Sequence, residues 1–312
     1  MLDGCKVAVV IPCYKVESQI GSVIQSIGQE VDFVIAVDDA CPNHSGKVAA
    51  GLEQRNVHVI FRDENGGVGA AFRDGALLAL QLGAEVIVKL DGDGQMDPRL
   101  IPHLVQPIAI GAADYCKGNR FSSRESLAEM PKLRMLGNSA LSFSMKFVTG
   151  YWSSSDPTNG FFAVRADVLT PSFLRALHPR YYLESSFMVE ARLADLRLKQ
   201  VAMDAKYGDE TSSLRIGKII VTFPFLMLRS LTRRLLIQYF LRDWSLGTFY
   251  LPLAMFFGPF GLLFGNQAFS EARRVGEYTS AGQAVIAAFC VLISVQFTIA
   301  FLSIDMSSEK KV

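Results

Sequence analysis

Two aspartates, Asp91 and Asp93, stand among glycines directly after the apolar, β-branched run Val86–Leu90. A buried strand that ends in a tight turn would hold both carboxylates at one edge of a sheet. Carboxylate oxygens are hard ligands, and a neighbouring pair of them can share a divalent cation with a diphosphate. This pair is therefore the first candidate for a metal site.

Several other metal- and phosphate-binding motifs are excluded by their spacing. An EF-hand loop that starts at Asp91 would need glycine at its sixth position and glutamate at its twelfth, where the chain has Met96 and Pro102. The segment Gly67-Val68-Gly69 lacks the third glycine of a dinucleotide fingerprint, because Phe72 stands there. The sequence contains no GxxxxGK[ST] phosphate loop and no GxSxG nucleophile elbow, and its four histidines lack metal-ligand spacing.

Alternating strand and helix patterns between residues 6 and 120 must position the two aspartates. The expected strands are Lys6–Ile11, Asp32–Val37, Val57–Phe61, Glu85–Leu90 and Asp114–Lys117. The expected helices lie between them, near residues 17–28, 44–54, 68–82 and 98–110. This rhythm predicts an α/β fold with a mostly parallel sheet, in which ligands bind beyond the carboxyl ends of the strands. Four polar turns fall there: Pro12-Cys13-Tyr14, Asp38-Asp39, Asn65-Gly66-Gly67 and Asp91-Gly92-Asp93.

Composition limits the classes of partner and compartment. The chain has 312 residues, of which 50% are hydrophobic, so one soluble domain with an appended membrane region fits its length. A net charge of +1 gives no indication of a nucleic-acid partner. Five scattered cysteines without a CxxC pair suit reduced thiols in the cytosol, and the N-terminus lacks the pattern of a signal peptide.

Two uncharged runs near the C-terminus, Trp244–Gly265 and Ala281–Ile304, are each long enough to cross a membrane. Pro252 and Pro259 would kink the first run. Its step Gly261-Leu-Leu-Phe-Gly265 can pack helices closely, so a homo-oligomer is one expectation. Cations before the first run and after the second favour both termini in the cytoplasm.

Two further segments, 131–149 and 214–244, combine apolar residues with cations. The second carries Arg215, Lys218, Arg229, Arg233, Arg234 and Arg242. Such helices suit the headgroup region of an anionic leaflet. The alternative is that they are ordinary surface helices of the soluble domain.

The series of motifs resembles the inverting family 2 glycosyltransferases. The quoted segments are Ile11-Pro12-Cys13-Tyr14 with Glu17, Val37-Asp38-Asp39, Glu64–Ala71, Asp91–Pro98, Gly118-Asn119-Arg120, Asp156–Phe161 and Tyr207–Ser212. With two C-terminal spans, the chain is similar to the membrane-bound polyprenyl-phosphate branch, which includes dolichyl-phosphate mannose synthase-like enzymes. The resemblance implies a GT-A, Rossmann-like catalytic domain, a nucleotide-diphosphate sugar donor and Mg²⁺ or Mn²⁺. Lys15 departs from the family, which often has asparagine there, and this puts the role of Glu17 in doubt.

The resemblance also implies roles for individual residues. Asp91 and Asp93 would hold the metal, while Asp93, Asp156 and Arg120 would be the catalytic residues. The donor would be bound by Pro12, Tyr14, Glu17, Asp38, Asp39, Asn65, Gly69, Asp91 and Glu184. Arg120, Lys206 and Arg215 would contact the acceptor phosphate. Several of these residues also have an alternative role that is only structural. These roles are helix capping for the Asp38-Asp39 pair, shaping of a turn for Asn65–Gly69, a surface position for Arg120 and Lys206, and a structural ion pair for Glu184.

The expected function is inverting sugar transfer to a polyprenyl, undecaprenyl-type phosphate at the cytosolic face of a bacterial inner membrane. A second reading is transfer to a hydroxyl of another lipid or lipid-linked oligosaccharide, which would need a base, with Asp156 as the candidate. A third is a non-catalytic scaffold that binds nucleotide sugar. The expected organisation is a catalytic domain over 1–212, juxtamembrane helices over 213–243, two spans over 244–304 and a tail over 305–312.

Overall fold

The computed structural model describes residues 1–52, 56–122, 132–204 and 216–312. These residues form two compact units. The first comprises Met1–Leu231 together with Lys310–Val312, and the second comprises Thr232–Glu309.

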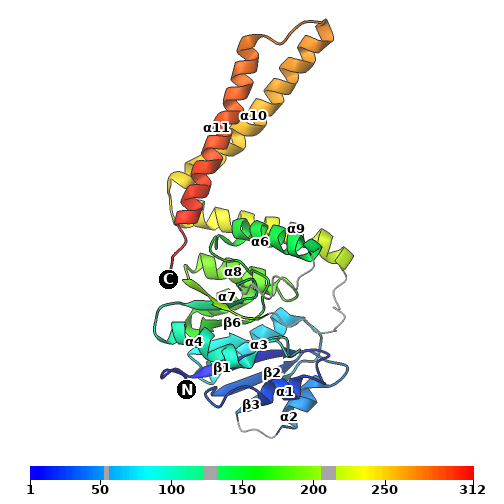
Figure 1. Ribbon diagram of the computed structural model, residues 1–312, viewed down its shortest axis with the longest axis vertical. Coiled ribbons are helices and arrows are strands. Elements are labelled where there is room, and N and C mark those ends of the chain that lie inside the picture. The colour runs from blue at the N-terminus through cyan, green and yellow to red at the C-terminus, as the bar shows by residue number, and fades with distance from the viewer. Residues whose placement is uncertain (53–55, 123–131, 205–215) are drawn as a thin grey trace. The chain divides into compact units, whose positions relative to one another are not determined.

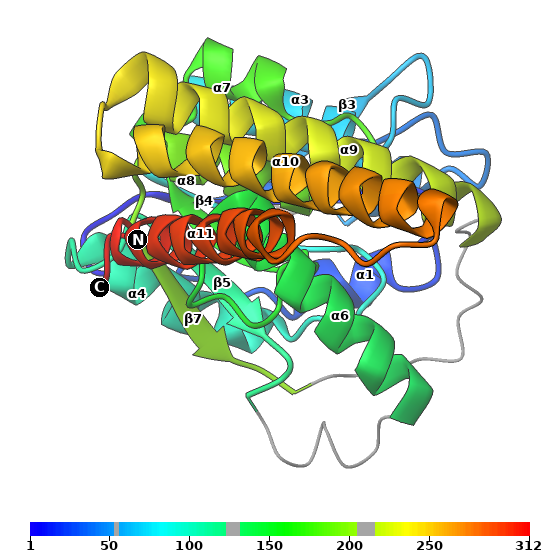
Figure 2. The same cartoon turned by 90° about the horizontal axis from the view of Figure 1, so that it is seen from above.

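The first unit is built on a seven-stranded sheet in the order β3-β2-β1-β4-β6-β5-β7. Its strands are β1 (Val7–Cys13), β2 (Phe33–Asp38), β3 (Val57–Phe61), β4 (Val86–Lys89), β5 (Tyr115–Asn119), β6 (Phe162–Arg165) and β7 (Leu198–Ala202). Strand β6 runs antiparallel to both of its neighbours, and all other pairs are parallel. Figure 2 shows β7 beside β5 at one edge of the sheet.

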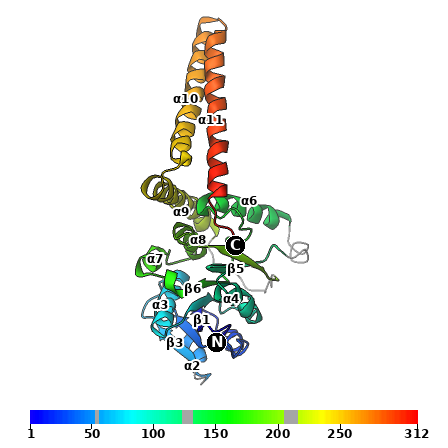
Figure 3. The same cartoon turned by 90° about the vertical axis from the view of Figure 1, so that its left-hand side faces the viewer.

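Apolar side chains of alternating strand positions point to opposite faces of this sheet. The shorter helices of this unit are α1 (Ile20–Gln25), α2 (Ser45–Ala50), α3 (Val68–Gln81), α4 (Ile101–Ala109), α7 (Pro171–Ala176) and α8 (Leu183–Leu193). Ala8 and Val10 belong to the core beneath α3, whereas Val7 and Val9 belong to the core beneath α1 and α4. Figure 3 shows α3 and α7 on one side of the sheet and α4 on the other.

All five strands expected from the sequence are present, with ends that differ by two residues at most. Strands β6 and β7 were not among the predicted elements. Strand β6 has four residues and follows a turn, so it carries little periodicity of its own. Its antiparallel pairing with β4 brings the loop before residue 162 to the end of β4, and this matters for the site.

Two longer helices, one in the first unit and one that runs from the first unit into the second, match the segments that the sequence marks as apolar and cationic. They are α6 (Lys132–Thr149) and α9 (Ile216–Leu236), and the second continues into a π-helical segment, Ile237–Arg242. Met145 of α6 and Met227 and Leu231 of α9 pack around Val189 of α8. Other apolar side chains of the two helices remain exposed, among them Phe143, Phe225 and Leu228.

The second unit contains a helical hairpin of α10 (Leu246–Val275) and α11 (Ala281–Ser307), shown in Figures 1 and 3. Both helices are long and apolar enough to cross a membrane. Helix α10 continues through Pro252 and Pro259 and ends ten residues beyond the expected span. A Cβ at Gly261 would lie 2.9 Å from Cβ of Cys290 on α11, so this glycine permits close packing of the two helices.

A buried polar cluster ties residues near the start of the second unit to the end of α11. The Arg234 guanidinium donates to Asp305 over 2.7 and 3.1 Å, and both side chains are about 1% exposed. The Tyr239 hydroxyl donates to the same carboxylate over 2.8 Å. Each partner of this buried charge pair is therefore compensated.

Candidate active site

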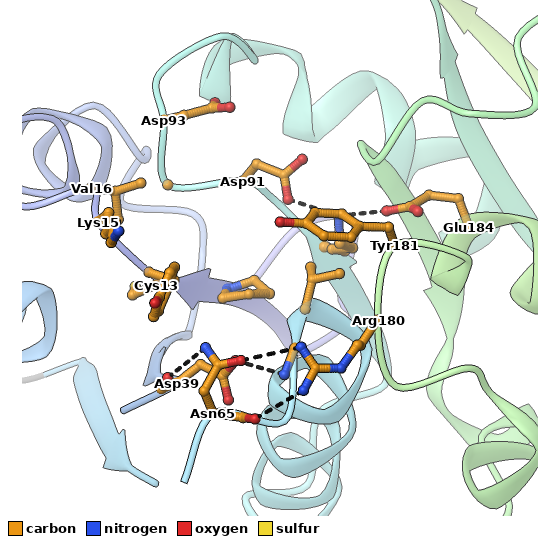
Figure 4. A pocket seen from close by; sticks show the side chains of 16 residues that line it. Cys13, Lys15, Val16, Asp39, Asn65, Asp91, Asp93, Arg180, Tyr181 and Glu184 are labelled. Carbon is orange, nitrogen blue, oxygen red and sulfur yellow. Dashed lines mark hydrogen bonds and ion pairs between the residues drawn. The ribbon is translucent and has the colours of Figure 1, made fainter. Parts of the chain in front are cut away.

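A pocket of about 710 Å³ lies at the carboxyl ends of β1, β2 and β4 (Figure 4). Its lining comprises Pro12, Cys13, Tyr14, Lys15, Val16, Asp39, Asn65, Gly67, Val68, Lys89, Asp91, Gly92, Asp93, Arg180, Tyr181 and Glu184. Seven of the predicted site residues are among them: Pro12, Tyr14, Asp39, Asn65, Asp91, Asp93 and Glu184. The four polar turns singled out in the sequence therefore meet at one place, as expected for the edge of a parallel sheet.

A fully buried lysine joins two of the carboxylates in this pocket. Nζ of Lys89, the last residue of β4, lies 2.7 Å from Oδ1 of Asp91 and 3.1 Å from Oε1 of Glu184. Burial alone would lower the pKa of the Lys89 ammonium, but Asp91 and Glu184 together outweigh burial and raise that pKa. Lys89 is therefore a fixed positive charge at the floor of the pocket.

Asp93 lies farther along the same turn, at the edge of the pocket (Figure 4). Its Oδ1 accepts a hydrogen bond from the backbone N–H of Gln95 over 3.0 Å, which orients the carboxylate. No group of three or more His, Cys, Asp or Glu side chains suited to a metal occurs among the residues that the structure describes. Asp91 and Asp93 thus supply two hard oxygen ligands in one pocket, which fits Mg²⁺ or Mn²⁺ if phosphate oxygens and water complete the shell.

Asp39 holds together the turns after β2 and β3. Its carboxylate accepts from Arg62 Nη1 over 2.5 Å and from the backbone N–H groups of Gly66 and Gly67 over 2.9 and 2.7 Å. The side chain of Asn65 donates to the Asp39 carbonyl over 3.1 Å. These bonds shape the pocket wall that Asp39 and Asn65 line.

Asp38 and Glu17 lie outside this lining. The buried Asp38 carboxylate accepts from the backbone N–H groups of Cys41 and Gly46, both over 2.6 Å, and so fixes the entry into α2. Glu17 accepts from Asn43 over 2.5 Å, and this hydrogen bond lowers the pKa of Glu17. The structure thus distinguishes the two adjacent aspartates, which the sequence alone cannot.

Gly69 lies at the first turn of α3, against the segment that precedes α8. Its N–H donates to the Pro179 carbonyl over 2.8 Å, and a Cβ at this position would lie 2.0 Å from the His178 carbonyl oxygen. The close approach places Arg180 beside Asn65, whose carbonyl oxygen accepts from Arg180 Nη2 over 3.3 Å. Gly69 therefore affects the pocket indirectly, because its missing side chain lets the backbone of His178 and Pro179 pack against α3.

Asp156 and Arg120 pair with each other. Nε and Nη2 of Arg120 each lie 2.8 Å from one oxygen of Asp156, and the Arg120 N–H donates to the same carboxylate over 3.1 Å. The Asp156 side chain is fully buried, and neither residue lines the pocket. Two other predicted acceptor contacts, Lys206 and Arg215, lie outside the described residues.

Four lining residues with charged or aromatic side chains were not among the predicted site residues: Lys15, Lys89, Arg180 and Tyr181. Lys89 offered a signal, because a lysine in the apolar strand Val86–Lys89 needs a counter-charge when it is buried. Arg180 and Tyr181 offered none, since they reach the pocket only through the fold of the segment before α8.

A second buried lysine, Lys117 on β5, contacts the loop before β6. Its Nζ donates to the Asn159 carbonyl oxygen. Burial lowers the pKa of Lys117 to about 8, although Glu184 and Asp156 act in the opposite direction. The pKa values of Lys117 and Lys89 therefore shift in opposite directions, because only Lys89 has carboxylates in direct contact.

A model of the family described as glycosyl transferase family 2 matches residues 8–171, which is more than half of the chain. The chain belongs to glycosyl transferase family 2. The matched residues include β1 from its second residue, all of β2 to β6 and every pocket residue from Pro12 to Asp93.

Distant relatives in this family transfer sugars to polyprenyl or dolichyl phosphates. A UDP-N-acetylglucosamine–dolichyl-phosphate N-acetylglucosaminyltransferase of Methanococcus voltae is 28% identical over 229 residues, which cover 69% of this chain and 90% of the relative. An undecaprenyl-phosphate mannosyltransferase of Micrococcus luteus is 30% identical over 200 residues, which cover 62% and 79%. The names of these two relatives differ in the sugar.

Solved structures confirm the fold. Glucosyl-3-phosphoglycerate synthase from Mycobacterium tuberculosis, in complex with Mn²⁺ and UDP-glucose, has a TM-score of 0.51 at 18% identity. The likeness covers 73% of this chain and 80% of that chain. This glycosyltransferase therefore has the expected α/β, GT-A-like fold with a mostly parallel sheet, together with two long apolar C-terminal helices.

Proposed function

We propose that this enzyme transfers a sugar, with inversion, from a nucleotide-diphosphate sugar to a polyprenyl phosphate of the undecaprenyl type. One observation carries the proposal: a pocket with the Asp91 and Asp93 carboxylates and three cations occurs in a family 2 chain that also has two apolar helices. The sugars and lipids named for the relatives support the same class of donor and acceptor.

The donor would lie with its diphosphate toward Asp91 and Asp93. These two residues would hold Mg²⁺ or Mn²⁺, which when bound stabilises negative charge on the leaving diphosphate. Pro12, Tyr14, Asp39 and Asn65 would contact the nucleoside, and Glu184 the sugar. Glu17, Asp38 and Gly69 would support these contacts from outside the lining.

The acceptor is proposed to be a phosphate monoester because the reaction then needs little base catalysis. Such a group has a second pKa near 6 and is largely dianionic at neutral pH. Its oxygen would attack C1 of the sugar as the bond between C1 and the diphosphate oxygen breaks, and the electron pair leaves with the nucleoside diphosphate. A hydroxyl acceptor would need a base, and the candidate base Asp156 is buried and bonded to Arg120.

We place the enzyme in a bacterial inner membrane, with residues 244–304 spanning it and residues 1–212 in the cytosol. Residues 213–243 would lie at the membrane surface. The apolar length of α10 and α11 and the exposed Phe225 and Leu228 on α9 support this arrangement. Arg120, Lys206 and Arg215 stay proposed contacts of the acceptor phosphate.

The test is sugar transfer from a panel of radiolabelled UDP- and GDP-sugars to undecaprenyl phosphate in detergent, with Mg²⁺ or Mn²⁺. We expect a lipid-linked product that mild acid releases and that Asp93→Asn does not form. Transfer to dolichol or diacylglycerol but not to undecaprenyl phosphate would overturn the phosphate-acceptor proposal.

A further inference from the structure

We propose that Lys89 is a positioning residue that couples the diphosphate end of the donor site to its sugar end. Its ammonium holds one oxygen of Asp91 and one oxygen of Glu184, so that the two carboxylates keep a fixed separation. The inference rests on the proposed function, because it assigns Asp91 to the metal and diphosphate and Glu184 to the sugar.

The ammonium of Lys89 is saturated by three acceptors from three separate segments. An ammonium has three N–H donors and no acceptor. Besides Asp91 Oδ1 and Glu184 Oε1, its third neighbour is the Gly160 carbonyl oxygen, 3.3 Å from Nζ. Lys89 therefore joins the turn after β4, the start of α8 and the loop before β6 at one point.

The two carboxylates need this cation to stay close together. Asp91 and Glu184 both line the pocket, and the side chains are 30% and 15% exposed. Two carboxylates that share a partly buried site repel each other. The Lys89 charge offsets this repulsion and holds both groups within the reach of one ammonium.

Gly160 leaves the space in which the lysine and the aspartate meet. A Cβ at residue 160 would lie 2.6 Å from Lys89 Nζ and 2.7 Å from Asp91 Oδ2. Both distances are below van der Waals contact, so any other residue at 160 would displace the ion pair. Lys89 also pairs with Phe162 in the sheet, which brings Gly160 to the end of β4.

A purely structural role and a positioning role of Lys89 predict different results when its substitution is combined with a substitution of Glu184. If Lys89 only fills a buried site, Lys89→Met and Glu184→Gln should lower transfer independently. If Lys89 acts through Glu184, the loss caused by Glu184→Gln should largely disappear once Lys89 is already methionine. The double variant should also melt at a higher temperature than Lys89→Met, because it removes the repulsion between Glu184 and Asp91.

The experiment measures kcat and KM for the sugar donor that the wild-type chain uses, in Lys89→Met, Glu184→Gln and the double variant. We expect Lys89→Met to lower kcat/KM on the order of 10²-fold, the loss that a misplacement of about 1 Å can cause. Lys199→Met is the matched control, because Lys199 is an exposed lysine on β7. It should change kcat/KM less than twofold.

A second variant keeps the inference testable if Lys89→Met fails to fold. Gly160→Ala retains every charge but pushes against Lys89 and Asp91, so it should lower kcat/KM while the circular dichroism stays that of the wild type. Gly21→Ala is its control, because a Cβ there meets only Val48 Cγ1 at 4.0 Å. Wild-type kinetics in Lys89→Met or in a folded Gly160→Ala, or independent losses in the cycle, would overturn the inference alone. A wild-type chain that transfers no sugar would overturn the proposed function as well.

Discussion

Arg120 and Asp156 form a bidentate ion pair in which both nitrogen–oxygen distances are 2.8 Å. Such planar pairs are among the stronger hydrogen-bonded contacts in proteins. The Asp156 carboxylate is buried, so it is held by Arg120 and is poorly placed to accept a proton from an acceptor hydroxyl.

The pair predicts how Asp156→Asn will behave. The asparagine should lower kcat by weakening its hold on Arg120, while the acid limb of the kcat/KM–pH profile keeps the wild-type shape. Arg120→Lys should give a similar loss, because lysine cannot form the planar two-bond contact. If the acid limb disappears in Asp156→Asn, Asp156 is the general base and the hydroxyl-acceptor reading gains support.

A second prediction concerns the divalent metal. Removal of metal with EDTA should abolish transfer, and Mg²⁺ or Mn²⁺ should restore it. Asp93→Asn should lower kcat on the order of 10²- to 10³-fold, the range seen when one electrostatic contact to a transition state is lost. The variant should still fold, because an asparagine oxygen can accept from the Gln95 N–H as Asp93 does.

The same substitution at a nearby turn provides the control for the metal prediction. Asp97 accepts from the backbone N–H of Arg99 and does not line the pocket. Asp97→Asn should therefore retain transfer and metal dependence. Transfer by the EDTA-treated wild type at the untreated rate would contradict the metal site.

A third prediction concerns Lys117. Burial lowers the pKa of this lysine from 10.5 to about 8. Between these values the unfolded chain binds more protons than the folded chain, so the contribution of Lys117 to stability rises with pH. Across the full interval this amounts to roughly 3 kcal/mol. The buried thiols of Cys13 and Cys116 have raised pKa values and act in the opposite direction above about pH 9.

The measurement is therefore the difference in thermal unfolding midpoint between the wild type and Lys117→Met from pH 7 to 9. The wild type should gain stability relative to the variant as the pH rises. Lys199→Met should follow the wild type throughout. A pH-independent difference for Lys117→Met would show that Lys117 has an ordinary pKa in the folded chain.

A fourth prediction concerns Arg234 and Asp305. Arg234→Met leaves the Asp305 carboxylate buried without its cation, and loss of one partner of a buried pair costs about 3–5 kcal/mol. The double variant Arg234→Met/Asp305→Leu should recover most of the loss, whereas the exposed neighbour Arg233→Met should have little effect. Thermal unfolding in detergent tests this, and an unchanged midpoint in Arg234→Met would contradict it.

The sequence was most informative where one element carries its own signal. Strand β4 and the turn with Asp91 and Asp93 could be predicted because apolar β-branched residues stop at glycines and carboxylates. The alternation of strands and helices predicted a parallel sheet, and four polar turns could therefore be assigned to one edge of that sheet. The antiparallel β6 was missed, because four residues after a turn have no distinctive period.

The sequence was least informative where partners are distant along the chain. Glu184 meets Lys89 only because α8 begins beside β4, with more than ninety residues between them. Asp38 and Asp39 have the same chemistry, and only the backbone N–H groups around them separate a helix-entry role from a pocket position. The ends of β-strands could thus be predicted from local pattern, but the pairing of their side chains could not.

The packing of the α10–α11 hairpin determines which of its surfaces are left for self-association. Cβ atoms at Gly261 and Gly265 would press on Cys290 and Ala287 of α11, so the small-residue step is occupied within one chain. Along α10, the rings of Phe256, Phe260 and Phe264 stack on one another, with centroids 5.8 and 6.0 Å apart, and Phe256 and Phe260 are exposed. A bulky residue at Gly261 would therefore disturb the packing of α10 on α11 within one chain. Any dimer of this chain must use a surface other than this glycine step.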